Sequence, residues 1–425
     1  MKPVLDLRNF TFLLSILWIL NGLSPASAQE QAQEDTLTVP QKKELHRKLL
    51  VMLHLPAQHF RPDVSYAGAY RQDAGRVARR QVAQELAHTM HMKILEDWPM
   101  PLLNIDCFQM ELIDDANAED VILKLKSDKR VAWAQVVNEF EAKASAGNSA
   151  TGNSIQPAQL YWSLREVHHV TTGKQVLVAV IDSAVETQHP DLRGQIESQE
   201  NFVDGKPWVA ESHGTHVAGV IVAKPGNHLG IVGIAPDARV MALRACAQDV
   251  DGKTQCSGFS LAKALYFAIN KGVKIINLSL SGPDDRLLRQ LIDLALSRDI
   301  KVVTAIDVRR ANGGYPASHP GVFSVSDKKM KSTFSSVLVA PGQDIPTTST
   351  GQTWSFVSGS SYSTAHVTGM LALLTQLQPT ISSDQLRHSL TRMPDMQGRP
   401  EGLLSLCDTL SKATAQCICA CQSGK

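Results

Sequence analysis

The chain has 425 residues, enough for two or three domains, and its 43% hydrophobic and 20% charged residues are ordinary proportions for a soluble globular protein. The formal net charge of +1 at pH 7 argues against nucleic acid and an anionic membrane surface as partners, because both attract strongly basic proteins. Most of the seven cysteines lie in one loop and in the C-terminal tail, which favours an oxidising compartment, and their odd number leaves one thiol over or paired with another chain.

Residues 1–28 have the pattern of a secretory signal peptide. Lys2 and Arg8 precede an apolar segment at 10–20, and small residues then lead to Ala28. The apolar segment is far shorter than the ~20 residues that cross a bilayer. We therefore expect cleavage after Ala28, no membrane span in the cleaved protein, and a secreted or periplasmic location.

A small α+β domain is predicted in residues 29–152, after a polar segment. With one further strand, which the pattern does not place, the element order fits the ferredoxin-like split βαβ arrangement. An unrelated small α+β domain is the alternative. The predicted strands are residues 49–55, 107–112 and 131–137, and the predicted helices are residues 74–90 and 117–126.

The segment 144–153 is small, polar and glycine-bearing, and we expect it to be an exposed linker. Exposed linkers of this kind are natural sites of proteolytic nicking. The junction between the two domains is therefore predicted between Phe140 and Gln156, and the second domain is taken to begin at residue 153.

In residues 153–400 strand-like and helix-like segments alternate, which predicts an α/β domain with a parallel sheet and helices on both faces. Ligands of such sheets bind outside the carboxyl ends of the strands, and Asp182 directly follows the first strand. The predicted strands are residues 176–181, 240–244, 274–280, 300–305 and 322–325, and the predicted helices are residues 213–222, 259–271, 286–298 and 361–377.

Six cysteines fall in two places. Cys246 and Cys256 flank a polar loop, and we expect a disulfide between them, with two free thiols as the alternative. Residues 401–425 form a Cys-rich C-terminal tail, in which disulfides are favoured over a metal site because no histidine lies near and the spacing is not that of common zinc sites. The pattern does not give the pairing of the tail cysteines, which are Cys407, Cys417, Cys419 and Cys421.

Three residues of the second domain have the types that acyl transfer needs. Asp182 follows a buried strand, His213 opens one helix and Ser361 opens a later one. A hydroxyl on the first turn of a buried helix lies in a field that favours negative charge. Each residue alone fits an ordinary cap, but the order Asp, His, Ser is one of the known orders of catalytic serine triads.

The segments around these residues resemble the motifs of the subtilisin-like serine proteases, or subtilases (peptidase S8 family). Residues 213–219 match His-Gly-Thr-His-Val-Ala-Gly in full, residues 182–184 resemble Asp-Ser/Thr-Gly, and residues 359–363 resemble Gly-Thr-Ser-Met-Ala. The resemblance covers about residues 161–390. It implies a secreted serine endopeptidase that forms an acyl-enzyme, and a first domain that acts as folding chaperone and intramolecular inhibitor.

By the same resemblance, Asp182, His213 and Ser361 are the catalytic triad. The substrate is a protein or peptide, bound as an extended strand between two backbone edges. The residues of these edges are Ser257 and Gly258 on one side and Leu280, Ser281 and Gly282 on the other. No cofactor is required, and a calcium site near Asp191 and Asn227 is left open, although that loop offers few carboxylates.

One residue departs from the family in a way that bears on catalysis. Subtilases usually have an asparagine that donates to the oxyanion, and Asp307 stands in its place. An ionised carboxylate cannot donate a hydrogen bond. Either Asp307 is protonated, or Asn312 or a backbone N–H supplies the donor. The alternative function is a weakened subtilase that binds peptides without useful turnover, and an esterase would share the same triad.

Overall fold

The computed structural model describes residues 47–55, 68–142, 144–149, 157–203, 205–226, 231–330, 336–394 and 401–419. The predicted signal peptide, Asn227 and Cys421 lie outside these residues. Within them, no helix combines the length and the apolar composition that crossing a membrane requires.

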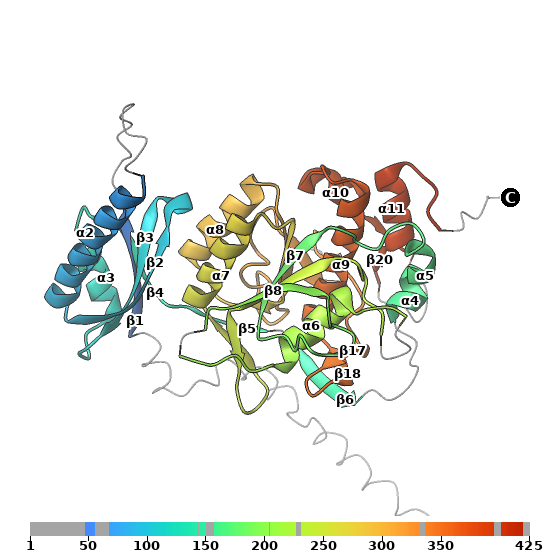
Figure 1. Cartoon of the computed structure of the whole chain (residues 1–425), viewed down its shortest axis with the longest axis horizontal. Helices are drawn as coiled ribbons and strands as arrows, with labels where there is room; N and C mark the ends of the chain where they lie inside the picture. Colours follow the sequence, from blue (N-terminus) through green and yellow to red (C-terminus); the bar gives the residue numbers. More distant parts are fainter. Residues whose placement is uncertain are drawn as a thin grey trace, which may run out of the picture. The chain divides into compact units, whose positions relative to one another are not determined.

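A parallel sheet forms the centre of the second domain (Figure 1). Within the described ranges it has seven strands in the order β16-β15-β14-β12-β7-β9-β8. The order reverses between β7 and β12, and at such a switch point the loops at the carboxyl ends diverge and leave a crevice. The strands are β7 (Leu177–Asp182), β8 (Ile196–Asn201), β9 (Arg239–Arg244), β12 (Ile275–Leu278), β14 (Lys301–Ala305), β15 (Phe323–Ser326) and β16 (Leu338–Val339).

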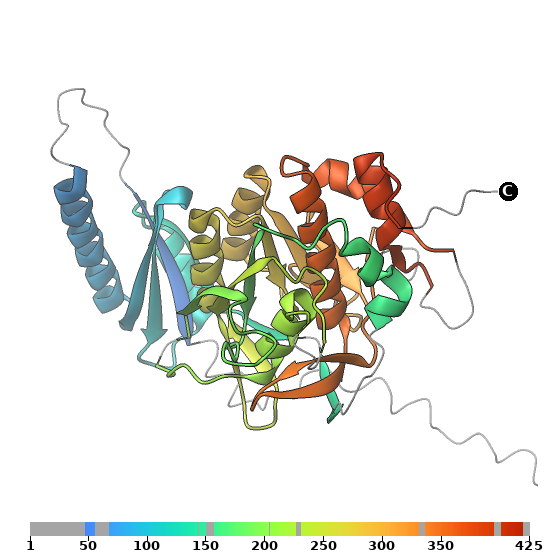
Figure 2. The same cartoon turned by 45° about the vertical axis from the view of Figure 1, so that its right-hand side comes forward.

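Helices cover both faces of this sheet, as predicted (Figures 1 and 2). Successive residues of a strand point to opposite faces. Val178 and Val180 accordingly pack in one core with α6 (Ser212–Val222) and α9 (Ser360–Leu377). Ala179 and Ile181 pack in a second core with α7 (Gly258–Lys271) and α8 (Arg286–Ser297). The apolar runs of the strands are explained by this burial on both faces.

The first domain has the βαββαβ order of the split βαβ arrangement. Its antiparallel sheet, in the part of the chain described, has the order β2-β3-β1-β4, and β2 is the strand that the sequence pattern did not place. β2 is an edge strand with a half-exposed residue pattern, which explains why no clear apolar period marks it. The elements are β1 (Lys48–His54), α2 (Gly68–Thr89), β2 (Met92–Met100), β3 (Ile105–Leu112), α3 (Ala118–Lys126) and β4 (Val131–Val136).

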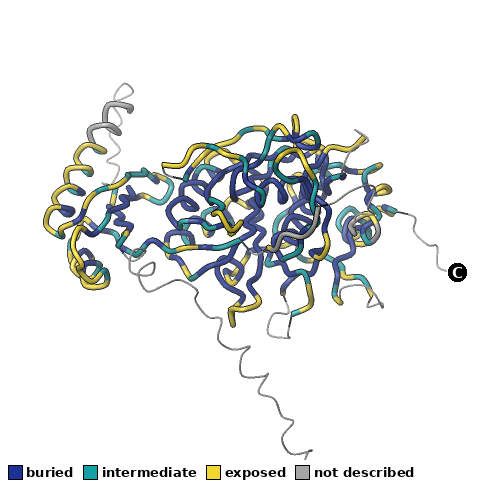
Figure 3. The backbone as a smooth tube through the Cα atoms, turned by 90° about the horizontal axis from the view of Figure 1, so that it is seen from below, coloured by how far each residue is buried: buried dark blue, intermediate teal, exposed yellow. Residues whose placement is uncertain are grey.

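Each face of this smaller sheet packs against a different partner. Leu49, Val51 and Leu53 of β1 share a core with α2 and α3. Leu50 and Met52 of the same strand belong instead to the core formed by α7 and α8. Burial on both faces explains why β1 is an unbroken apolar run, whereas the outer sides of α2 and α3 are exposed (Figure 3).

Part of the predicted linker is a strand. β5 (Glu139–Ala142) and β6 (Ser145–Ser149) follow β4, and β6 pairs with β18 (Thr353–Ser358). β18 also pairs with β17 (Ile345–Ser349). Small polar residues predicted an exposed linker here, because the local pattern contains no information about a partner strand about 200 residues away.

The described C-terminal segment, predicted as a separate tail from residue 401, packs in the core of the second domain. After α10 (Ser383–Ser389), β19 (Thr391–Arg392) pairs with β20 (Leu404–Ser405), and α11 (Leu406–Thr414) follows. Leu404, Leu406 and Leu410 are buried in the same core as α6 and α9. Trp162 Nε1 also donates a hydrogen bond of 2.8 Å to the Leu404 carbonyl.

Disulfides close both cysteine-containing regions. One disulfide joins Cys246 and Cys256, at the ends of the hairpin formed by β10 (Cys246–Gln248) and β11 (Thr254–Ser257). Another joins Cys407 to Cys419, and Cys417 is also disulfide-bonded. Among the described residues, Cys107 is the free thiol, and it is buried in β3.

Candidate active site

Asp182 and His213 form a buried hydrogen-bonded pair at the carboxyl end of the sheet. Asp182 is the last residue of β7, and His213 is the second residue of α6. His213 Nδ1 lies 2.7 Å from Asp182 Oδ1, and the side chains are 5% and 3% exposed, respectively. Because the carboxylate accepts, Nδ1 carries the proton and Nε2 is left as the acceptor. Nε2 is buried and has no hydrogen-bond partner in the described part of the chain.

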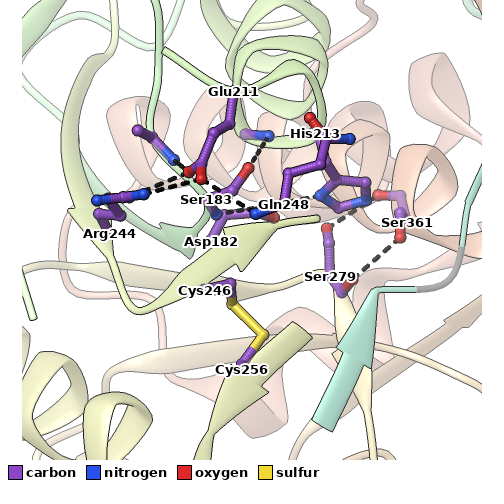
Figure 4. The surroundings of a disulfide bond; sticks show 12 residues. Asp182, Ser183, Glu211, His213, Arg244, Cys246, Gln248, Cys256, Ser279 and Ser361 are labelled. Carbon is purple, nitrogen blue, oxygen red and sulfur yellow. Dashed lines mark hydrogen bonds and ion pairs between the residues drawn. A yellow bond between two sulfur atoms is a disulfide. The ribbon is translucent and has the colours of Figure 1, made fainter. Parts of the chain in front are cut away.

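The turn that precedes α9 places Ser361 next to the imidazole of His213 (Figure 4). β18 ends at Ser358, and Gly359 adopts a φ of 139°, which glycine tolerates far better than other residues. Ser361 is fully buried, and its Oγ donates a hydrogen bond of 3.0 Å to the carbonyl of Ser279, just after β12. Figure 4 shows the imidazole of His213 between the side chains of Asp182 and Ser361.

The first turn of α9 gives Ser361 a distinct electrostatic setting. Backbone N–H groups of a helix's first turn have no partner within the helix and carry partial positive charge. Ser279 fixes the turn from the other side, since its Oγ donates a hydrogen bond of 3.0 Å to the Ser361 carbonyl. The arrangement therefore offers a hydroxyl, an imidazole whose Nε2 makes no other hydrogen bond within the described residues, and a field that stabilises negative charge.

A buried ion pair joins the segments that carry Asp182 and α6. Arg244 ends β9 in register with Asp182, and Glu211 is the N-cap residue of α6. The Glu211 carboxylate accepts from Arg244 Nη2 at 2.8 Å and from Nε at 3.1 Å. It also accepts from the backbone N–H groups of Ala184 and Gln248, at 2.7 and 3.0 Å (Figure 4). The sequence does not predict this pair, because nothing in either local pattern links the two residues.

Tyr362 packs against two histidines of α6. Its ring centroid lies 5.9 Å from that of His213 and 6.0 Å from that of His216, and its hydroxyl lies 3.2 Å from His216 Nδ1. Burial, with a smaller contribution from His213, lowers the pKa of His216 to about 3. Burial likewise lowers the pKa of His366 to about 4. The imidazoles of His216 and His366 are therefore neutral at pH 7 and pack as part of the core.

These two buried histidines predict a loss of stability in mild acid. An imidazole in the unfolded chain takes up a proton near pH 6.5, whereas the folded pKa values are about 3 for His216 and about 4 for His366. Between pH 6.5 and these folded pKa values, the unfolded state binds more protons than the folded state. The free energy of unfolding therefore decreases as the pH is lowered, by up to about 1.4 kcal/mol per pH unit for each histidine.

His366→Gln should reduce this dependence of the unfolding free energy on pH, measured by urea unfolding from pH 7.5 to 4.5. The exposed control His388→Gln should leave it unchanged, and equal slopes for wild type and His366→Gln would contradict the assignment.

The predicted substrate-binding residues flank a strand of the chain itself. β5 lies between β11 and β13 (Leu280–Ser281) and pairs antiparallel with both. Glu141 pairs with Gln255 of β11 and with Ser281 of β13. Ala142 pairs with Leu280, which directly follows the residue that binds Ser361. The register therefore directs β5 toward Ser361.

Ser257, Gly258 and Gly282 complete these edges. Ser257 is the N-cap of α7, and the N–H of Gly258 donates a hydrogen bond of 2.8 Å to the Asn138 carbonyl, just before β5. Phe140 is buried, and a Cβ added to Gly282 would lie 2.4 Å from its ring. Only glycine leaves room for the Phe140 ring at this position.

The loop after β14 holds Asp307 among arginines. Asp307 is buried, and its Oδ1 accepts from the N–H of Arg309 at 3.1 Å and from Arg309 Nε at 3.2 Å. Arg310 Nε lies 3.6 Å from Asp307 Oδ2. These contacts stabilise negative charge on Asp307, and the hydrogen bond to Asp307 raises the pKa of Arg309. Asn312 is exposed, and its side-chain oxygen accepts from the N–H of Gly314 at 3.0 Å.

The calcium hypothesis receives no support from the described residues. Asp191 is buried, and its Oδ2 accepts from Trp354 Nε1 at 2.7 Å and from the N–H of Ile231 at 3.3 Å. No group of three or more His, Cys, Asp or Glu side chains within the described ranges could hold a metal ion. Asn227, the other candidate ligand, lies outside those ranges.

Comparison with known proteins identifies close similarity over most of the second domain. The subtilase family model matches residues 173–400. Subtilisin NAT of Bacillus subtilis subsp. natto is 33% identical over 295 residues, which cover 64% of this chain and 72% of the relative. Subtilisin BL of Lederbergia lenta is 36% identical over 231 residues, covering 52% of this chain and 83% of the relative.

A solved structure shows the same fold. Fervidolysin from Fervidobacterium pennivorans, a keratinolytic enzyme related to subtilisin, superposes with a TM-score of 0.65 at 21% sequence identity. The match covers 86% of this chain and 60% of that chain.

Proposed function

The chain belongs to the subtilase family and is a serine endopeptidase, and we propose that Asp182, His213 and Ser361 perform its chemistry through an acyl-enzyme. The observation that carries the proposal is the 2.7 Å hydrogen bond between Asp182 and His213, which leaves His213 Nε2 as a buried acceptor beside Ser361. The alternative of a peptide-binding module without turnover finds no support in the comparisons.

In the proposed mechanism, Ser361 Oγ attacks the carbonyl carbon of the peptide bond while its proton passes to His213 Nε2. Asp182 stabilises the imidazolium and holds the ring in the tautomer that keeps Nε2 free. The imidazolium then protonates the leaving amine, which breaks the C–N bond, and water hydrolyses the ester by the reverse proton path. Before attack, the Ser361 hydroxyl exchanges its hydrogen bond to Ser279 for one to Nε2.

We also propose that the first domain is an intramolecular inhibitor. β5 fills the space between β11 and β13, the two edges that an extended substrate would use. Side chains hold it there, because Asp285 Oδ2 accepts from Gln135 Nε2 at 3.0 Å and from Asn138 Nδ2 at 2.8 Å. Lys263, buried in α7, binds Glu96 of the first domain at 2.8 Å.

The position of β5 narrows the proposed processing site. Because the register runs from Glu141 to Ala142 toward Ser361, we place the hydrolysed peptide bond between Ala142 and Ser145. The inhibitory domain would then span residues 29–142. Secretion is proposed from the signal-peptide pattern of residues 1–28 and from the disulfides, which persist in oxidising compartments.

A fluorophosphonate probe tests the proposal directly. We expect the full-length protein, after processing, to be labelled at Ser361, with loss of peptide hydrolysis in proportion to labelling. Pre-incubation with a peptide substrate should slow the labelling. Failure to label Ser361 in a protein that still hydrolyses peptides would contradict the assignment of the nucleophile.

Asp307→Asn should raise kcat at neutral pH. The ion pairs of Asp307 keep a negative charge near the site, whereas an asparagine amide at this position can donate a hydrogen bond to the oxyanion. One such donor is worth about 10²–10³ in kcat, which sets the upper limit of the gain. The measurement is kcat against pH for wild type and Asp307→Asn on one peptide.

Two results would contradict this account of Asp307. Coincident profiles would mean that its side chain does not face the oxyanion, and a large loss would mean that the carboxylate itself is needed to hold Arg309. Asn312→Ala tests the other candidate donor in the same loop, and an unchanged kcat is expected from it because the Asn312 side chain is exposed and accepts from the N–H of Gly314.

A further inference from the structure

We propose that the substrate-binding strands carry a subsite for an acidic side chain, formed by Lys253 of the β10–β11 turn and Arg309 of the loop after β14. Peptides with Glu or Asp at the position of Glu141 in β5 would be preferred as substrates. This inference rests on the proposed function, because it takes β5 as a bound substrate strand.

Glu141 is bound by two cations from opposite sides of the strand. Lys253 Nζ lies 3.6 Å from Glu141 Oε1, and Arg309 Nη2 lies 3.5 Å from Oε2. The Glu141 side chain is 32% exposed, so these ion pairs are only partly screened by water. Because the backbone of Glu141 pairs with both Gln255 and Ser281, its carboxylate is fixed between the two cations.

The loops that carry both cations are held by contacts within the second domain. Lys253 lies in the β10–β11 turn, where its N–H donates a hydrogen bond of 2.8 Å to Asp249 Oδ1. The Cys246–Cys256 disulfide closes this hairpin at its base. Arg309 is held by its contacts with Asp307. Both loops belong to the second domain, so the same two charges would meet an incoming peptide after β5 has left.

The residues on either side of Glu141 show that only one face of a strand bound in place of β5 would meet the two cations. Alternate residues of an extended strand share a face. Glu139 and Glu141 therefore lie on the face near Lys253, and Phe140 points the opposite way into the core beside Gly282. Burial raises the pKa of Glu139, and the positive charges of Lys48 and Lys253 oppose that shift. Lys253 therefore faces two carboxylates, but it forms an ion pair with Glu141.

The size of the expected preference for Glu over Gln follows from how exposed Lys253 and Arg309 are. Lys253 and Arg309 are 44% and 66% exposed. Ion pairs of this kind each change an equilibrium by about 1.4- to 5-fold, so the two together should favour Glu over Gln by roughly 2- to 25-fold. The preference should weaken as ionic strength rises.

The test uses the full-length chain, after it has processed itself, and peptides with the sequence of residues 138–147. Three peptides carry Glu, Gln or Lys at the position of Glu141. We expect kcat/KM to fall in the order Glu, Gln, Lys, and Lys253→Met to reduce the Glu-to-Gln ratio by about 1.4- to 5-fold. Lys253→Glu should reduce the preference for the Glu peptide further than Lys253→Met does, because the new carboxylate opposes the charge of Arg309 that remains. Lys271→Met, on the exposed end of α7, is the control that should leave all ratios unchanged.

Equal kcat/KM values for the three peptides would overturn the subsite while leaving the endopeptidase proposal intact. Hydrolysis of none of them would overturn the proposed function, and a second measurement then decides the subsite. In the full-length Ser361→Ala chain, Lys253→Met should speed hydrogen exchange of the β5 amides by about 1.4- to 5-fold, and Glu141→Gln, which loses both ion pairs, by roughly 2- to 25-fold. The double variant should exchange little faster than Glu141→Gln alone, and multiplicative effects would show that Lys253 and Glu141 do not interact.

Discussion

Replacement of Ser361 with alanine is expected to abolish both peptide hydrolysis and processing of the chain, with a loss on the order of a million-fold in kcat. The alanine variant keeps the helix and the core, but it has no oxygen to form the ester with the acyl group. The measurement is the rate of conversion of the full-length chain, followed by gel electrophoresis, together with hydrolysis of a fluorogenic peptide.

The matched control for this variant is Ser363→Ala. Ser363 is another buried serine on the first turns of α9, and its Oγ donates a hydrogen bond of 3.0 Å to the Ala340 carbonyl. Loss of that bond should cost about 1 kcal/mol of stability and leave kcat within a fewfold of wild type. If Ser361→Ala matures when expressed alone and hydrolyses peptides, Ser361 is not the nucleophile.

Asp182→Asn should lower kcat by about 10⁴. The substitution preserves the size of the side chain but removes the negative charge that faces the imidazolium 2.7 Å away. An asparagine amide can also donate to Nδ1, which would place the imidazole proton on Nε2, where it cannot accept from Ser361. The measurement is kcat against pH on the same peptide, with the rate of chain processing as a second readout.

Thermal unfolding separates catalysis from folding in this experiment. Asp182 Oδ1 also accepts a hydrogen bond of 2.7 Å from the N–H of Ser183, so an amide group turned toward His213 Nδ1 would lose this bond. The cost is about 1–3 kcal/mol, which is smaller than the usual stability of a domain. The variant is therefore expected to fold with both disulfides formed. A folded Asp182→Asn protein with less than a tenfold loss in kcat would contradict the assigned role.

The sequence was most informative where a residue's function depends on a short local pattern. Asp182 follows an apolar run, and His213 and Ser361 each open a helix, so local patterns predicted all three as candidates. The strands of the central sheet were predictable for the same reason, since burial on both faces requires unbroken apolar runs. β8 was missed because it is an edge strand with polar, mostly exposed residues, and β16 was missed because it has only two residues.

Features that depend on distant partners could not be predicted in this way. The strand β5 pairs with β11 and β13, which lie more than a hundred residues further along the chain. The packing of α11 in the core was hidden because its sequence resembles a polar, Cys-rich tail. The pairing of Glu211 with Arg244 depends on the order of strands in the sheet, which no local period specifies.

The most direct test of the central claim is intact-mass and N-terminal analysis of the wild-type chain and of Ser361→Ala after identical expression and purification. We predict that the wild-type protein yields a fragment whose new N-terminus lies between residues 143 and 145, and that Ser361→Ala remains uncut in this segment. The same cut in Ser361→Ala expressed alone, or a wild-type cut far from β5, would contradict the account.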